Sequence, residues 1–309
     1  MSSIRIRAHA KINLHLRVGP RRADGYHDID TIFQSLDLHD TLICDARPGP
    51  FALSCDAPGV PTDDSNLVAR AARLLADAAG RPCEGVAVHI DKRIPTQAGL
   101  GGGSADAAAA LVALARVWRI DTGTDGVDLF ALGRRLGADV SFILHGGTMR
   151  GVGRGDDLAR LPAFPPSQVL IVMPDVGVST ADAYRWHDEA AGDAGWPGDV
   201  PLPAAGGADA AAAWRAVEAR FANDFEGPVG ARHPAIPATL ARLREAGASL
   251  ARMSGSGASM FGLFETRDRA EAAAARLTAS GWPSPGWRCL LTRTVAASEA
   301  GPAIGSADA

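Results

Sequence analysis

A glycine-rich segment in the first half of the chain constrains the fold more than any other feature of the sequence. It covers residues 95–105 and reads PTQAGLGGGSA. The preceding residues, 85–94, alternate apolar and polar side chains, which predicts a strand. The alanine-rich stretch at 105–118 predicts a helix, with Ser104 as its N-cap and Asp106 near its positive first turn. Such a strand, glycine turn and helix N-terminus form an anion site, because free backbone N–H groups and missing Cβ atoms admit phosphate oxygens.

Two familiar phosphate motifs do not fit this segment. A Walker A loop ends in G-K-[ST], but Gly103-Ser104-Ala105 contains no lysine. A Rossmann G-x-G-x-x-G fingerprint that starts at Gly99 would end on Ser104. What remains is a P-x-x-x-G-L-G-G-G-S loop that leads into a helix, with a flexible hinge or tight turn as the alternative. The position between a strand and a helix favours phosphate binding.

The size and charge of the chain exclude several classes of protein. At 309 residues it exceeds the usual size of one hydrophobic core, so two domains are expected. A hydrophobic content of 47% and a charged content of 21% are typical of a globular protein. The net charge of −4 and the pI of about 6.1 lack the basic footprint of a protein that binds nucleic acid or an anionic membrane.

The cysteines and the N-terminus indicate where such a protein would work. Cys44, Cys55, Cys83 and Cys289 show neither C-x-x-C spacing nor a zinc pattern, so we expect reduced thiols. The N-terminus lacks the apolar core of a signal peptide, and no apolar run is long enough to span a bilayer. We therefore expect a soluble, cytoplasmic protein with no nucleic-acid or membrane partner.

Periodicity along the rest of the chain predicts an α+β fold. Residues 10–18 alternate strictly, as in a half-buried strand, and place Lys11 and Asn13 on the same face. The glycine-rich residues 146–155 are expected to form a turn, and 192–209 a mobile loop. Further strands are expected at 29–42, 51–55, 168–173, 250–254, 258–264 and 286–295, and further helices at 66–79, 125–136, 179–189, 210–222, 236–246 and 267–280.

Three prolines, at 162, 165 and 166, indicate a domain boundary. We expect an N-terminal domain at 1–160, a C-terminal domain at 161–297 and a disordered tail at 298–309.

The glycine loop resembles the central motif of the GHMP kinases, the family of galactokinase, homoserine kinase and mevalonate kinase. Two other stretches narrow the resemblance: Ala10-Lys-Ile-Asn-Leu14 with Asp24-Gly-Tyr-His27, and Gly137-Ala-Asp-Val140. They are similar to the members that phosphorylate the 2-hydroxyl of a cytidine-diphosphate-linked methylerythritol in the non-mevalonate route to isoprenoid precursors. The stretch Met253-Ser-Gly-Ser-Gly-Ala-Ser259, preceded by Asn223-Asp224, is a further family signature. This resemblance implies two domains with mixed sheets, each packed with helices, and an active site in the cleft between them.

The resemblance also implies a role for particular residues. Asp139 would take the proton from the substrate hydroxyl, and Lys11 would stabilise negative charge at the transferred phosphoryl group. From pattern alone, a helix N-cap would be the simpler reading of Asp139, and a solvated strand lysine that of Lys11. ATP would bring Mg²⁺, for which Ser104 is a possible ligand. The ATP-binding residues would be Pro95, Thr96, Gln97, Ala98, Gly99, Leu100, Gly101, Gly102, Gly103, Ser104 and Ala105.

The acceptor side follows from the same resemblance. Tyr26 and His27 would hold the cytidine, and Tyr184 would stack on the cytosine. Thr180 lies four residues before Tyr184, which puts both on one helix face, although an aromatic residue on a helix is more often in the core. The substrate-binding residues would be Asn13, Tyr26, His27, Thr180, Tyr184, Gly255, Ser256 and Gly257.

Three functions remain open from the sequence. The first is the kinase for the cytidine-linked alcohol, acting as a monomer or weak homodimer. The second is a GHMP kinase for another small alcohol, such as homoserine or a mevalonate derivative. The third is a binding module that kept the fold but lost the chemistry. Tyr26 and His27 favour a substrate with a base, and the presence of both Lys11 and Asp139 argues against a mere binding module. One departure from the family is Ser141, which stands where a proline commonly follows Asp-Val and raises a question only about local backbone geometry.

Overall fold

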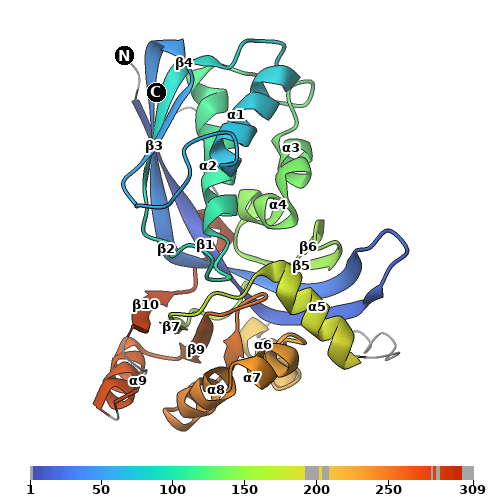
Figure 1. The fold of residues 1–309 in the computed structure, drawn as a ribbon, viewed down its shortest axis with the longest axis vertical. Helices are drawn as coiled ribbons and strands as arrows, with labels where there is room; N and C mark the ends of the chain where they lie inside the picture. Colours follow the sequence, from blue (N-terminus) through green and yellow to red (C-terminus); the bar gives the residue numbers. More distant parts are fainter. Residues whose placement is uncertain (1–2, 192–201, 204–208, 280, 283–285, 301–309) are drawn as a thin grey trace.

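The structure, a computed structural model, describes residues 3–191, 202–203, 209–279, 281–282 and 286–300. Its strands form two sheets, and helices pack against each of them (Figure 1). The predicted α+β class is therefore confirmed.

The first sheet contains the two longest strands of the described chain, β1 and β2, which pair with each other as an antiparallel hairpin. The other strands follow the order β3-β4-β2-β5-β6, and all pairs are antiparallel except β3 with β4. The strands are β1 Ser3–Arg21, β2 His27–Pro50, β3 Ala52–Cys55, β4 Glu84–Asp91, β5 Thr148–Gly153 and β6 Asp157–Arg160.

Four helices pack along one side of this sheet, as Figure 1 shows. The central helix, α2, is alanine-rich and buried along most of its length, because small side chains let it lie close to β1 and β2. The helices are α1 Leu67–Ala78, α2 Gly102–Val117, α3 Leu129–Leu136 and α4 Ala138–His145.

The second sheet is antiparallel, with the order β10-β7-β9-β8. Its strands are β7 Gln168–Met173, β8 Ala251–Met253, β9 Met260–Phe264 and β10 Arg288–Arg293. Apolar residues on one face of this sheet form a second core with α8 and α9, and those on the other face belong to the core shared with the first sheet. The remaining helices are α5 Thr180–Ala191, α6 Ala210–Glu218, α7 Glu226–Arg232, α8 Ala235–Glu245, α9 Arg267–Ala279 and α10 Ala297–Ala300.

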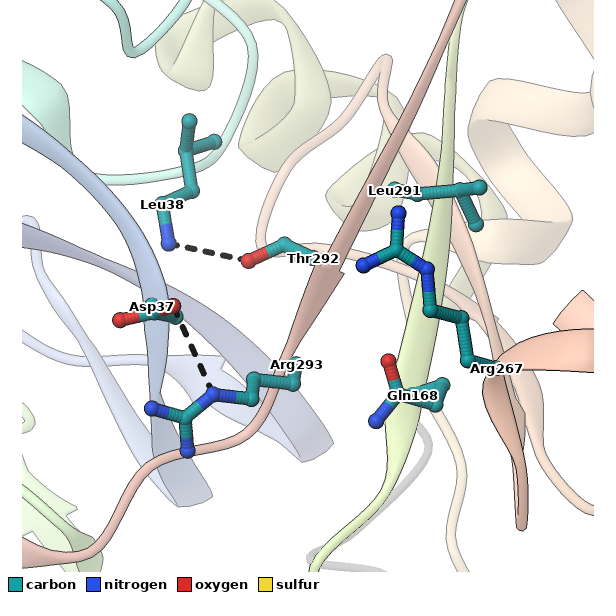
Figure 2. A pocket seen from close by; sticks show the side chains of 7 residues that line it. All are labelled: Asp37, Leu38, Gln168, Arg267, Leu291, Thr292 and Arg293. Atoms are coloured by element: carbon teal, nitrogen blue, oxygen red, sulfur yellow. Dashed lines mark hydrogen bonds and ion pairs between the residues drawn. The ribbon is translucent and has the colours of Figure 1, made fainter. Parts of the chain in front are cut away.

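The two sheets meet where β10 passes beside β2 (Figure 2). The backbone N–H of Leu38 donates to the Thr292 hydroxyl at 2.9 Å, and a single β-bridge joins Leu36 to Thr294. The helix α10 follows and packs back onto β1 and β2. The C-terminal end of the described chain therefore returns to the first sheet.

Several sequence predictions about local structure are wrong. Helix α2 begins at Gly102 and is capped by Gly101 with φ of 72°, so Ser104 is not its N-cap and Asp106 lies beyond its first turn. Left-handed Gly101 lets the chain enter the helix earlier than serine capping would require. The helix expected from residue 125 begins only at Leu129, because the Asp128 carboxylate accepts from the N–H groups of Phe130 and Ala131.

The glycine-rich stretch expected to be a turn contains strand β5 instead. A Cβ at Gly151 would lie 2.9 Å from the Phe33 ring and 2.8 Å from the Gly155 carbonyl oxygen, so glycine is required here by close packing within the sheet.

Other differences concern elements that carry weak sequence patterns. Strand β6 and helix α7 had no counterpart among the predictions. Residues 298–300 belong to α10, whereas 301–309 lie outside the described residues. The predicted loop at 192–209 also lies mostly outside them. All four cysteines are free thiols, as predicted.

Candidate active site

The glycine loop is fixed between β1 and the second glycine turn at 254–257. The Lys11 N–H donates to the Leu100 carbonyl at 3.0 Å, and the Ser254 hydroxyl donates to the Gly99 carbonyl at 2.9 Å. Gly99 has φ of 71°, and a Cβ there would lie 2.2 Å from the Ser254 carbonyl oxygen. Only glycine fits this approach, so the two glycine turns singled out from the sequence form one continuous surface.

Lys11 lies beneath this loop and points towards α4. Its Nζ is 3.4 Å from Oδ2 of Asp139 and donates to Oδ1 of Asn13 at 2.8 Å. A Cβ at Gly101 would lie 2.9 Å from the Lys11 Cγ, so the absence of a side chain at Gly101 makes room for the lysine stem. Lys11 is only 5% exposed, which excludes the interpretation of a solvated strand lysine.

Asp139 occupies the first turn of α4 rather than its N-cap, which is Gly137. The positive end of the helix favours a negative charge at this position. The Asp139 side chain is 32% exposed, so a substrate can reach it although Lys11 beside it is covered. At Ser141 the helix continues without a break, but the hydroxyl is buried and has no hydrogen-bond partner among the described residues.

A short chain of hydrogen bonds holds Asn13 in place. Its amide donates to the Thr31 hydroxyl at 2.7 Å, and this hydroxyl donates to the His15 carbonyl at 2.8 Å. Asn13 therefore links the Lys11 side chain on β1 to Thr31 on β2. The sequence predicted the shared face of Lys11 and Asn13, but not Thr31.

A cavity of about 750 Å³ opens at the start of α4, next to Asp139 in the sequence, and is also lined by the hairpin tip, the end of α3, the turn between β5 and β6, and α5. It is lined by four of the predicted substrate residues and by five arginines that the sequence did not single out. The former are Tyr26, His27, Thr180 and Tyr184, and the latter are Arg21, Arg134, Arg135, Arg154 and Arg185. Asp156 and Asp188 are the carboxylates that line it.

His27 is buried at the edge of this cavity. Its Nδ1 lies 2.8 Å from the Gly19 carbonyl oxygen, so Nδ1 carries a hydrogen and Nε2 is the acceptor in the neutral ring. Nε2 lies 3.4 Å from the Asp188 carboxylate. The His27 ring also stacks on Tyr184, with the centroids 4.9 Å apart.

The two tyrosines of the cavity have different environments. Tyr26 is 53% exposed, and the Arg154 guanidinium lies 4.4 Å from its ring centroid. Tyr184 packs edge-on against Phe225 as well as on His27. Burial, and then the charge of Asp139, raise the pKa of Tyr184 to about 12.

The second glycine turn connects to both α5 and Asn223. The hydroxyls of Thr180 and Ser256 lie 3.1 Å apart. The Asn223 amide donates to the Met253 and Gly255 carbonyls, each at 2.8 Å. Thr180, Tyr184 and the turn therefore lie along one side of the site, as the spacing on α5 predicted.

A buried charge cluster behind the glycine loop escaped the sequence interpretation. Lys92 forms ion pairs with Asp40 and, at 2.8 Å, with Asp106 of α2. Burial raises the pKa of Asp106 to about 7, although Lys92 opposes this shift. The pKa of Lys92 is raised overall, because the two carboxylates outweigh the opposing effect of burial. Lys92 lies shortly before the loop and could have been noticed, but Asp40 is distant in sequence and gave no local signal.

Models of protein families identify the class of proteins to which the chain belongs. Residues 66–147 match the N-terminal domain of GHMP kinases, and residues 208–283 match their C-terminal domain. The chain is therefore an ATP-dependent small-molecule kinase of the GHMP class.

Curated relatives define the family more narrowly. The chain is 43% identical to the 4-diphosphocytidyl-2-C-methyl-D-erythritol kinase of Anaeromyxobacter sp. (strain K), over 93% of this chain and 90% of the relative. It is 41% identical to the enzyme of the same name from Pelotomaculum thermopropionicum, over 93% and 96% of the two chains. The chain belongs to the family of 4-diphosphocytidyl-2-C-methyl-D-erythritol kinases.

Solved structures agree with this assignment. A crystal structure of 4-(cytidine 5'-diphospho)-2C-methyl-D-erythritol kinase superposes with a TM-score of 0.75 at 36% identity, covering 94% of this chain and 99% of the other. A homoserine kinase from Cytophaga hutchinsonii gives a TM-score of 0.63 at 19% identity, covering 96% and 95% of the two chains, and shares the fold. Within the described residues, none of the helices is both long and apolar enough to cross a membrane.

Proposed function

We propose that the chain transfers the γ-phosphoryl group of ATP to the 2-hydroxyl of 4-diphosphocytidyl-2-C-methyl-D-erythritol, giving the 2-phosphate and ADP. The observation that carries this proposal is the position of the Lys11–Asp139 pair. The pair lies between the glycine loop and the arginine-lined cavity, with Nζ and Oδ2 3.4 Å apart. This arrangement would make a donor site, a base and an acceptor site contiguous.

The reaction assigns each group a separate task. The Asp139 carboxylate would accept the proton of the substrate hydroxyl as its oxygen bonds to the γ-phosphorus. The bond from that phosphorus to the bridging oxygen of ADP breaks, and ADP leaves with the electron pair. Lys11 would stabilise the charge on the transferred phosphoryl oxygens, and the N–H groups at the start of α2 would hold the phosphates of ATP.

The composition of the cavity favours a nucleotide-linked acceptor over a small hydroxy acid. Its volume of about 750 Å³ suits a ligand of drug size. Five arginines line it against two aspartates, which favours a substrate that carries a diphosphate. His27 lines the cavity, and its Nε2, which lies 3.4 Å from the Asp188 carboxylate, would contact the exocyclic amine of cytosine. Homoserine and mevalonate offer neither group.

Magnesium would enter with ATP. The chemistry of phosphoryl transfer calls for a cation that bridges the terminal phosphates, and Mg²⁺ is usually held by phosphates and water with few protein ligands. Ser104 in the first turn of α2 is the candidate ligand on this chain. We expect a monomer or a weak homodimer, and a cytoplasmic location in view of the free thiols.

The test is an assay of ADP release with a panel of alcohols, in which the product is identified by phosphorus NMR. We expect the cytidyl methylerythritol to give the highest kcat/KM, with homoserine and mevalonate at least about a hundredfold lower because they leave the cavity's polar groups unpaired. Cytidine monophosphate should inhibit by competition with the acceptor and not with ATP. Faster turnover of homoserine or mevalonate would refute the proposal.

A further inference from the structure

Two histidines and an aspartate gather on the β1–β2 hairpin, apart from the glycine loop and the acceptor cavity. His9 of β1 pairs directly with His39 of β2, and Asp37 lies two residues before His39. Asp37 lies in an irregular stretch of β2, where the register against β1 shifts, and its side chain lies beside the two histidines. One ring nitrogen of each histidine and a carboxylate oxygen of Asp37 lie within 4.8 Å of one another.

The backbone fixes the orientation of both rings. Nδ1 of His9 lies 2.8 Å from the Leu36 carbonyl oxygen, and Nδ1 of His39 lies 2.6 Å from the Asp37 carbonyl oxygen. A carbonyl only accepts, so each Nδ1 carries a hydrogen and each neutral ring presents the lone pair of Nε2. Metal-binding histidines are commonly held in this way, with one nitrogen on a carbonyl and the other on the metal. Burial also lowers the pKa of His9, which favours the neutral ring.

The cluster has one open side and a nearby cation that competes for Asp37. His9 is buried, whereas Asp37 and His39 are partly exposed. Arg293 of β10 approaches the Asp37 carboxylate at 3.5 Å and binds Glu299 of α10 at 2.8 Å. Figure 2 shows Arg293 and Asp37 side by side at a pocket of about 310 Å³ between β2 and β10.

The geometry points to a binding site for a divalent transition metal, with Nε2 of His9, Nε2 of His39 and the Asp37 carboxylate as ligands. Two imidazoles and one carboxylate suit Zn²⁺, Co²⁺ or Ni²⁺, whereas Mg²⁺ prefers oxygen ligands. Water would complete the coordination. A metal here takes Asp37 from Arg293, which is one of the ties between β2 and β10. The site is independent of the kinase reaction proposed above.

The experiment is a titration of the metal-free enzyme with Co²⁺ and with Zn²⁺ in excess Mg²⁺. We expect one Co²⁺ per chain, with the visible absorption of a nitrogen and oxygen site and without the thiolate charge-transfer band that cysteine ligands would give. Zn²⁺ should displace this Co²⁺ and raise the Tm of the wild-type chain. Binding should weaken as the pH falls and the imidazoles become protonated.

Variants separate this site from general metal binding. His39→Ala and Asp37→Asn should each weaken Co²⁺ binding at least about tenfold, because loss of an outer partner alone typically costs about that much. His89→Ala is the matched control, since His89 also lies on a strand, β4, and bonds to Ser54, so its loss should change nothing. Arg293→Gln should tighten binding by removing the competitor for Asp37.

Circular dichroism and the Tm without metal would show that each variant folds. Unchanged Co²⁺ affinity in folded His39→Ala, a thiolate band in the spectrum, or no bound Co²⁺ in the wild-type chain would each overturn the proposal.

Discussion

The glycine loop, the proposed donor side, is built mainly from backbone, whereas the proposed acceptor cavity is walled by side chains from separate elements. The loop contacts β1 and the second glycine turn through carbonyls, and a Cβ at Gly99 would lie 2.2 Å from the Ser254 carbonyl oxygen. The cavity instead combines the hairpin tip, α4 and α5. Changes on the donor side should therefore alter geometry, and changes on the acceptor side should alter recognition. Lys11 and Asp139 lie where the two sides meet.

Among these variants, removal of Asp139 should lower activity the most, because the transfer from bound ATP to the bound acceptor would depend on its carboxylate. We expect Asp139→Ala to lower kcat by about two to four orders of magnitude, the usual cost of losing a general base, with small changes in KM for either substrate. Steady-state kinetics and a Tm measurement check this. Asp156→Ala removes another carboxylate, one that lines the cavity, and as the control should retain most of kcat. Undiminished turnover by folded Asp139→Ala would contradict the proposed role.

A methyl group at Gly99 should impair the use of ATP without affecting binding of the acceptor. The added Cβ meets the Ser254 carbonyl at a backbone φ of 71°, so the loop has to shift. We expect Gly99→Ala to lower kcat/KM for ATP by about ten- to a hundredfold, because small displacements of reacting groups are costly.

The matched control for this loop variant is Gly80→Ala. Gly80 has φ of 61° but open space around its Cβ position, so its variant suffers only the backbone strain of about 1–3 kcal/mol. Gly99→Ala should unfold at a lower temperature than Gly80→Ala. Equal Tm values and normal ATP kinetics would show that the loop does not need glycine here.

Loss of His27 should weaken binding of the acceptor and not of ATP. His27→Ala should raise KM for the cytidine-bearing substrate about tenfold, as expected for one hydrogen bond to a base, and leave KM for ATP unchanged. His187→Ala is the control, because His187 is another buried histidine, packs against His27 and Phe225, and does not line the cavity. Equal changes in both KM values would argue against recognition of the base by His27.

The smallest effect concerns the ionisation of Tyr184, which reports on the charge at Asp139. The pKa of Tyr184 is raised to about 12, first by burial and then by Asp139, so Asp139→Asn should lower this pKa by a fraction of a unit. The chain contains only two tyrosines, so phenolate absorbance in the wild-type and Tyr184→Phe chains assigns the transition.

The raised pKa of Tyr184 also makes the stability of the folded chain depend on pH. The folded chain holds this proton more tightly than the unfolded chain, so the contribution of Tyr184 is present below pH 10 and is lost as the pH rises towards 12. An identical Tyr184 transition in Asp139→Asn would show that the two groups are not coupled.

Strong local patterns in the sequence predicted most elements of the fold. The helix at 66–79 is α1, and the strand at 168–173 is β7. The prediction failed where glycine serves close packing rather than a turn, as in β5, and where the start of a helix depends on a left-handed glycine, as in α2. In both places the backbone conformation is decided by neighbours that are distant in sequence.

The sequence by itself determined the glycine-rich turn between a strand and a helix, and predicted that it binds phosphate, because both depend on local backbone chemistry. Only the tertiary structure decided that Lys11 is buried and points towards Asp139, and that Lys92 is held between Asp40 and Asp106. Alternation along β1 allowed an exposed lysine equally well. Burial depends on what packs over a strand, and these contacts come from distant parts of the chain that no local pattern records.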